Sequence, residues 1–274
     1  MIGIQFRKVY HQLLPVSQNL AQHDTERIFE HVLNISRSEL YLRFNVAIPA
    51  NHLKQIQNLV TQRLSGLPLE YVLKYSCFYS NKFMVSTDVL IPRPETEILI
   101  EIVCENKKDK HCCFIDFGTG SGIIAETLIE KNDTWKAVAV DISFPALKIA
   151  KQNCSRKIGL LCSDRLHSLK PGQLFDFIVS NPPYISRKEM ELLDKSVIDF
   201  EPHQALYGGV EGLDFYIYLA KNGVYYLKKN GSIFCEIGSD QESKVTRIFK
   251  DSGWNDITIY YDLAKRPRVL KAHL

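Results

Sequence analysis

The sequence predicts an α/β protein in which a doubly wound, parallel sheet follows a small helical domain. Three observations support this prediction. After residue 110, short apolar strands alternate with amphipathic helices. The first of these strands runs directly into a glycine-rich turn at residues 116–122. The first 70 residues show helical periodicity instead, and a chain of 274 residues is long enough for two domains.

Residues 1–72 are expected to form the helical domain. The stretch "SRSE" at 36–39 is a capping box, with Ser36 as N-cap. Gly66 suits the end of the helix that precedes it. The apolar residues of that helix fall on one stripe: Leu53, Ile56, Leu59, Val60 and Leu64.

Residues 73–92 are expected to form a linker that contains a β-hairpin. Residues 76–90 are rich in aromatic and β-branched side chains, with a turn at Ser80-Asn81. "IPRPE" then excludes a helix until Pro94, which suits a first helical position. A catalytic domain at 93–274 would follow.

Within that domain the alternation has the spacing of parallel βαβ units. The expected helices are 94–106, 121–131, 145–154, 213–229 and 240–253. The expected strands are 112–117, 136–142, 157–164, 175–184, 231–238 and 256–262.

The bulk composition excludes several classes of protein. Hydrophobic residues at 45% and charged residues at 24% are typical of a soluble globular chain. A net charge of +3 argues against a protein that grips duplex DNA through many phosphates, and no apolar run is long enough to span a membrane. Seven cysteines without paired spacing indicate reduced thiols and no metal site. Arg7 and Lys8 faintly resemble a mitochondrial presequence, but we expect a cytoplasmic protein.

The glycine-rich turn, "DFGTGSG", is the first candidate site. Gly118, Gly120 and Gly122 alternate with Thr119 and Ser121, whereas a plain strand–helix turn would need only one glycine. The order G-x-G-x-G differs from the dinucleotide fingerprint G-x-G-x-x-G and suits a ligand without a pyrophosphate. The helix that follows offers free N–H groups.

Acidic residues end the next two strands at the same edge of the sheet. Asp141 lies 19 residues after Gly122, where a carboxylate can accept hydrogen bonds from both ribose hydroxyls. Asp164 and Arg165 are placed to meet an adenine base, and a solvated acid–base pair in a loop fits the pattern equally well. The combination resembles the class I S-adenosylmethionine-dependent methyltransferases. This resemblance implies S-adenosyl-L-methionine as cofactor, with Asp116 near its cationic end, and a Rossmann-like, seven-stranded, mostly parallel sheet.

The stretch "IVSNPPYIS", residues 178–186, is the second candidate site. An amide nitrogen is a weak nucleophile, so two acceptors aimed at its hydrogens would orient it and stabilise positive charge. The Asn181 side chain, facing the cofactor, and the Pro182 carbonyl could supply them. Pro183 keeps the turn rigid, and Tyr184 offers a flat wall for a planar group.

Longer segments are similar to the PrmC/HemK family of release factor glutamine-N5 methyltransferases. They are "LPLEYVLKYSCFYSNKFMVSTDVLIPRPETE", "DFGTGSG", "VAVDIS", "SNPPYI", "EPHQALYGGVEGLDFY", "EIGSDQ" and "DLAKRPRV". The resemblance implies that residues 118–122 and Asp141 hold the cofactor. It also implies that residues 181–184 clamp the glutamine of the Gly-Gly-Gln motif in class-1 release factors, while the helical domain grips the rest of that partner.

The chain departs from the family at two positions. Arg165 stands where an aromatic residue usually packs on the adenine, although a guanidinium can stack as well. Lys74 replaces a usual glycine.

Four other functions fit part of the pattern. A glutamine methyltransferase of a ribosomal protein would share all of the chemistry. A DNA adenine-N6 methyltransferase shares "NPPY" but should carry a basic domain that reads bases. A nicotinamide-dependent oxidoreductase would place its third glycine one residue later. A non-catalytic binding module would use the same cofactor site without transfer.

Overall fold

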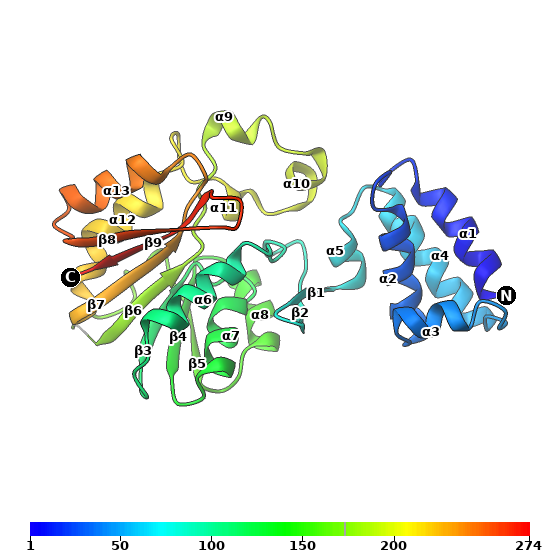
Figure 1. Ribbon diagram of the computed structural model, residues 1–274, viewed down its shortest axis with the longest axis horizontal. Helices are drawn as coiled ribbons and strands as arrows, with labels where there is room; N and C mark the ends of the chain where they lie inside the picture. Colours follow the sequence, from blue (N-terminus) through cyan, green and yellow to red (C-terminus); the bar gives the residue numbers. More distant parts are fainter. Residues whose placement is uncertain (173) are drawn as a thin grey trace. The chain divides into compact units, whose positions relative to one another are not determined.

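The computed structural model describes residues 1–172 and 174–274, which divide into two compact units, 1–75 and 76–274 (Figure 1). The first unit is helical. Its elements are α1 (Ile2–Leu13), α2 (Ala21–Leu33), α3 (Arg37–Leu42), α4 (Ala50–Leu64) and α5 (Leu69–Leu73). Their apolar faces enclose a separate core, which includes Leu13, Ile28, Phe29, Leu40 and Ile56.

The sequence features of the helical unit are present with one exception. Ser36 and Glu39 form the predicted capping box at the start of α3. Ile56 and Val60 of α4 are buried as expected, but Leu64 is 39% exposed. The prediction for Leu64 is wrong because Arg63, on the inward side of the last turn, forms a buried ion pair with Asp24 at 2.8 Å.

The predicted hairpin consists of β1 (Tyr75–Phe78) and β2 (Asn81–Met84). Tyr79 and Ser80 between them both have positive φ, at 48° and 65°, as expected for a two-residue turn with the twist of the strands. The turn therefore lies one residue earlier than predicted.

Helix α6 (Thr96–Asn106) starts two residues later than predicted. Pro94 belongs instead to a turn, in which the Thr96 N–H donates to the Arg93 carbonyl at 3.1 Å. In this turn the Arg93 guanidinium contacts the buried Glu201 at 2.6 Å. The ion pair between Arg93 and Glu201, which lie far apart in the sequence, thus fixes the start of the helix.

The second unit contains the predicted seven-stranded, mostly parallel sheet. Its strands are β3 (Cys113–Phe117), β4 (Lys136–Asp141), β5 (Ile158–Cys162), β6 (Phe175–Ser180), β7 (Leu227–Glu236), β8 (Asp256–Tyr261) and β9 (Pro267–His273). Their order is β5-β4-β3-β6-β7-β9-β8, and β9 is antiparallel to both of its neighbours. The remaining helices are α7 (Ile123–Lys131), α8 (Phe144–Asn153), α9 (Arg187–Met190), α10 (Lys195–Phe200), α11 (His203–Leu206), α12 (Asp214–Asn222) and α13 (Glu242–Asp251).

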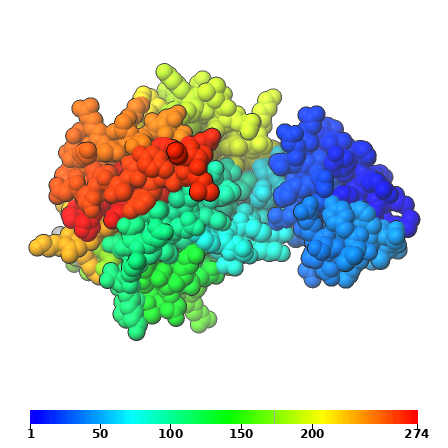
Figure 2. Space-filling view, in the orientation of Figure 1, coloured from blue at the N-terminus to red at the C-terminus, as the bar shows by residue number. Residues whose placement is uncertain are grey.

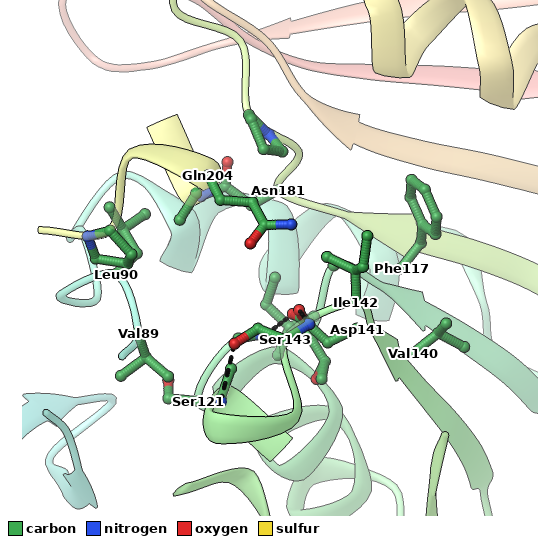
Figure 3. A pocket seen from close by; sticks show the side chains of 18 of the residues that line it. Val89, Leu90, Phe117, Ser121, Val140, Asp141, Ile142, Ser143, Asn181 and Gln204 are labelled. Carbon is green, nitrogen blue, oxygen red and sulfur yellow. Dashed lines mark hydrogen bonds between the residues drawn. The ribbon is translucent and has the colours of Figure 1, made fainter. Parts of the chain in front are cut away.

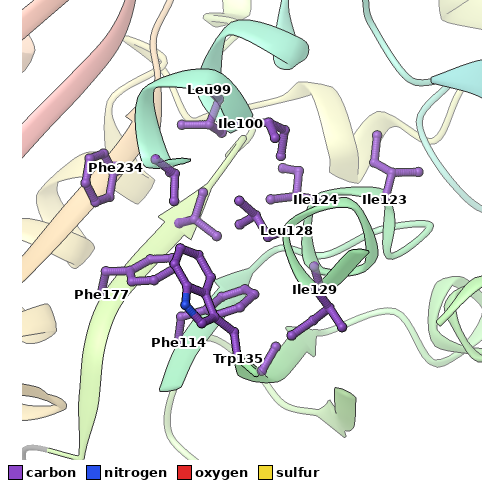
Figure 4. Close-up of a cluster of buried hydrophobic side chains, with 14 of the residues drawn as sticks. Leu99, Ile100, Phe114, Ile123, Ile124, Leu128, Ile129, Trp135, Phe177 and Phe234 are labelled. Atoms are coloured by element: carbon purple, nitrogen blue, oxygen red, sulfur yellow. The ribbon is translucent and has the colours of Figure 1, made fainter. Parts of the chain in front are cut away.

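Two apolar cores cover the two faces of this sheet. Successive residues of a strand point to opposite faces, so Phe114 belongs to one core and Ile115 to the other. On the first face Phe114 stacks on Phe177, with ring centroids 4.7 Å apart, and Trp135 packs edge-on against Phe177 (Figure 4). This aromatic layer gives the strands a close-packed base from which the loops at their carboxyl ends project.

Two predictions about the last third of the chain are wrong. The helix expected over 213–229 ends at Asn222, and Leu227 already starts β7, because this segment pairs with β6 and β9. Strand β9 was not predicted. A proline and three basic residues interrupt the alternation of apolar and polar residues that would indicate a strand. The segment becomes a strand through its pairing with β7 and β8. Figure 2 shows the red C-terminal residues packed among the orange and teal segments of the same unit.

Candidate active site

A cavity of about 260 Å³ opens at the carboxyl ends of the parallel strands (Figure 3). Its walls come from the loops that follow β3, β4, β5 and β6, and from residues 88–93 and 202–205. Of the residues predicted for the site, these line the cavity: Gly118, Thr119, Gly120, Ser121, Asp141, Asp164, Arg165, Asn181 and Pro183.

The three glycines of the loop after β3 have positive φ but serve two purposes. At Gly118 and Gly120, with φ of 73° and 55°, an added Cβ would meet no atom within 4 Å, so the loop backbone is accessible to a ligand. At Gly122 a Cβ would lie 2.5 Å from the Cys154 Sγ. The third glycine therefore allows close packing of the loop against α8, while the first two face the cavity.

Asp116 fixes the conformation of this loop through hydrogen bonds. Its Oδ2 accepts hydrogen bonds from the Thr119 hydroxyl at 2.6 Å and from the Ala125 N–H at 3.1 Å. The side chain is fully buried, and this burial raises the pKa of the carboxyl to about 7. Asp116 does not line the cavity, so the structure gives it the role of fixing the loop and shows no direct path to a ligand.

Asp141 joins two of the cavity loops. Its Oδ2 accepts from the Gly120 N–H and its Oδ1 from the Ser143 N–H, each at 2.8 Å. Figure 3 shows Asp141 and Ser143 side by side at the cavity. Desolvation raises its pKa, although these hydrogen bonds oppose the shift. Because each carboxylate oxygen has a second lone pair, both can accept another hydrogen bond from the cavity side. Two adjacent hydroxyls of a ligand would match this pair of acceptors.

Arg165 forms part of the wall beyond β5 in an unusual conformation. Its φ is 55°, and its guanidinium lies over the ring of Tyr218, 4.7 Å from the centroid. Tyr218 in turn is held by its hydroxyl, which accepts from the Leu166 N–H at 3.2 Å. A planar cationic group that is packed against an aromatic ring therefore forms this part of the cavity wall.

Asn181 reaches the cavity from the end of β6, and two residues that sequence reasoning missed hold it there. Its Nδ2 donates to the Thr96 Oγ1 at 3.0 Å, and Thr96 donates to the Glu236 Oε2 at 2.7 Å. Burial raises the pKa of Glu236 to about 7. Thr96 lies in "IPRPETE" and Glu236 ends β7 beside β6, which are the sequence signals that could have identified them.

Two other residues of "NPPY", Pro182 and Tyr184, lie outside the lining of the cavity that Asn181 borders. Pro182 is buried and does not line the cavity. Tyr184 borders a second, polar hollow, and its hydroxyl lies 3.5 Å from the Glu236 Oε1. Burial raises the pKa of this phenol, which keeps it neutral. The structure thus does not bring the Tyr184 ring to the wall of the main cavity.

A glycine-rich segment supports the backbone of this loop. A Cβ at Gly208 would lie 2.4 Å from the Pro183 carbonyl oxygen, and one at Gly212 would lie 2.2 Å from the Tyr184 carbonyl oxygen. The Gly208 N–H also donates to the Ile185 carbonyl at 2.9 Å. The segment "YGGVEG" therefore packs backbone against backbone, and no larger residue fits at these two positions.

Neither a metal site nor a membrane span is found in the described residues. Residues 1–172 and 174–274 contain no group of three potential metal ligands. In the same ranges no helix has the length and apolar character to cross a membrane. All the cysteines are free.

Comparison with known proteins then identifies the family. Residues 7–73 match the PrmC N-terminal domain, and residues 93–199 match the methyltransferase small domain. The release factor glutamine methyltransferase of Koribacter versatilis is 38% identical over 242 residues, 87% of this chain and 86% of that protein. The bifunctional methyltransferase of Rickettsia typhi is 34% identical over 284 residues, 95% of this chain. The chain spans only 55% of that longer relative.

A solved structure agrees at the level of the fold. A methyltransferase from Pyrococcus furiosus superposes with a TM-score of 0.54 at 14% identity, covering 79% of this chain and 98% of that one. The sheet order, the cavity at its carboxyl edge and the extended sequence identity lead to one assignment. The chain belongs to the PrmC/HemK family of release factor glutamine methyltransferases.

Proposed function

We propose that this protein methylates the side-chain amide nitrogen of the glutamine in the Gly-Gly-Gln motif of class-1 release factors. The observation that carries the proposal is the carboxamide of Asn181, held at the rim of a nucleoside-sized cavity by a hydrogen bond from its own nitrogen. This leaves the amide oxygen as an acceptor for a substrate N–H₂ group.

The cavity fits S-adenosyl-L-methionine as the methyl donor. Gly118 and Gly120 leave the backbone open to close approach, and Asp141 keeps two oxygens available for the ribose hydroxyls. Thr119, Ser121 and Arg165 complete the surface around these groups. When bound, this cofactor supplies a methyl group on a sulfonium, which is already activated for transfer to nitrogen.

The residues of the chain act mainly by orienting the acceptor. The Asn181 oxygen would accept one N–H hydrogen of the glutamine amide, which directs the nitrogen lone pair toward the methyl group. The Pro182 carbonyl would accept the second hydrogen, although Pro182 is buried and outside the cavity lining, so the substrate loop has to reach it at the edge of the Asn181 loop. No hydrogen bond in the described part of the chain uses the Pro182 carbonyl. Since positioning carries the rate, no strong base is needed before transfer. Pro183 and Tyr184 would shape the approach of the substrate loop.

The N-terminal helical unit would recognise the body of the release factor. It matches the PrmC N-terminal domain, and its core is independent of the sheet domain. We further propose that the protein acts in the cytoplasm, where its free thiols remain reduced and its substrate takes part in translation termination.

Mass spectrometry of a release factor tests the proposal directly. After incubation with the protein and S-adenosyl-L-methionine, the Gly-Gly-Gln peptide should gain the mass of one methyl group. A release factor with Gln→Ala in this motif should gain none. Methylation of both release factors, or of neither, would contradict the proposed function.

A further inference from the structure

A chain of hydrogen bonds that starts at the cavity wall joins three side chains from distant parts of the sequence. Asn181 donates to Thr96, and Thr96 donates to Glu236. Thr96 and Glu236 are 1% and 2% exposed, so water does not compete for these contacts. The three residues lie at the end of β6, the start of α6 and the end of β7.

The carboxylate end sets the direction of this chain. Above its pKa of about 7 the Glu236 carboxylate is ionised and can only accept, so at such a pH the Thr96 hydroxyl hydrogen points to Glu236. The Thr96 oxygen can then only accept, and Asn181 must offer it the N–H₂ side of its carboxamide. The oxygen of Asn181 is turned the other way, and Figure 3 shows this side chain projecting into the cavity.

We propose that Thr96 and Glu236 are positioning residues that keep the Asn181 oxygen toward the substrate. The inference rests on the proposed function, because an amide substrate presents hydrogens and requires an acceptor. If the Asn181 carboxamide were rotated by half a turn, its N–H₂ group would face the N–H₂ group of the substrate, and neither could accept a hydrogen bond. The pair therefore favours a substrate nitrogen that carries hydrogens, and it does so through the orientation of Asn181.

Thr96→Val is the main test, because it keeps the shape of the side chain and removes the hydroxyl. The productive orientation of Asn181 then leaves its N–H without an acceptor. We expect kcat to fall about 10- to 100-fold, as for a lost buried hydrogen bond, with unchanged affinity for S-adenosyl-L-methionine. Thr96→Ser should restore most of the activity.

Thr127→Val is the matched control. Thr127 lies on α7, is 2% exposed and has a hydroxyl without a partner among the described residues. Its replacement repeats the change of a buried Thr to Val away from Asn181, so kcat should stay at the wild-type value.

Glu236→Gln tests the other end of the chain. A glutamine at this position can donate to Thr96 as well as accept from it, so the direction is no longer imposed. The loss of kcat should be smaller than for Thr96→Val but measurable. Wild-type kcat in Glu236→Gln would remove Glu236 from the proposal.

An NMR measurement tests the orientation independently of activity. The side-chain amide signals of Asn181, assigned by their loss in Asn181→Ala, should show one hydrogen with slowed solvent exchange. This protection should disappear in Thr96→Val and persist in Thr127→Val. If the wild type methylates no release factor, the proposed function fails while this result still decides the orientation. Unmoved Asn181 signals in Thr96→Val, or a kcat equal to that of Thr127→Val, would overturn the inference.

Discussion

The glycine loop after β3 and the Asn181 loop after β6 follow neighbouring strands of one sheet, yet they are held by different kinds of contact. The glycine loop is fixed by nearby residues: Thr119 binds Asp116 three positions away, and Gly120 binds Asp141 across 21 positions. Asn181 instead binds Thr96 across 85 positions.

This difference separates two tasks within one cavity. Hydrogen bonds to the carboxylates of Asp116 and Asp141 shape the half that would hold the cofactor, and the hydrogen bond from Asn181 to Thr96 shapes the half that would hold the acceptor amide. Mutations in the first half should change cofactor affinity, whereas those in the second should change kcat.

Asn181→Ala should have the largest effect on kcat, and it should change only the half of the cavity that would hold the acceptor amide. Loss of an acceptor that stabilises developing charge typically lowers kcat by about 100- to 1,000-fold. The dissociation constant of S-adenosyl-L-methionine, measured by calorimetry, should barely change because the glycine loop is intact. A variant with full kcat would show that Asn181 does not orient the substrate.

Asp141→Ala should give the opposite pattern. Its carboxylate lines the cavity and would lose its hydrogen bonds to the ligand, which weakens cofactor binding by about 10- to 100-fold. At saturating cofactor, kcat should remain near the wild-type value. Equal affinities in the two proteins would exclude Asp141 from the ribose site.

Gly208→Ala should affect the acceptor half through the backbone. The added methyl group would overlap the Pro183 carbonyl and displace the Asn181 loop. We expect about a 10-fold loss of kcat, since small misplacements of reacting groups are costly. Gly159→Ala is the control, because the nearest atom to its Cβ is 3.8 Å away and no steric strain is expected. Equal kcat values in the two variants would refute the packing role of Gly208.

The buried carboxyls Asp116 and Glu236 should make stability depend on pH. Burial raises both pKa values to about 7, so in the folded state each group retains its proton well above its unfolded pKa. Their contribution is therefore fully favourable below pH about 4 and is lost as the pH rises through 7.

Glu236→Gln removes one of these two carboxyls and should raise the thermal midpoint above pH 7. The free energy of unfolding should increase by on the order of 2 kcal/mol above pH 7, and this increase should vanish below pH about 4. Exposed Glu105→Gln should change neither value. A gain that is independent of pH would show that the Glu236 carboxyl is not the cause.

The same contrast explains what could be predicted from the sequence. The parallel sheet, the glycine loop and Asp141 follow from local patterns, because periodicity and glycine spacing act within a few residues. Strand β9, the start of α6 and the partners of Asn181 depend on contacts between distant segments. The position of Tyr184 outside the lining of the main cavity also depends on distant segments: its hydroxyl lies near Glu236, and its backbone is packed against Gly212.

A crystal structure with S-adenosylhomocysteine and a Gly-Gly-Gln peptide would decide whether the cavity has these two halves. We expect the ribose hydroxyls on Asp141 and the glutamine amide nitrogen within hydrogen-bonding distance of the Asn181 oxygen. The Asn181 nitrogen should still be bonded to Thr96. A nucleoside bound outside this cavity, or a glutamine that faces the nitrogen of Asn181, would contradict the division of the cavity and the role of Asn181 in it.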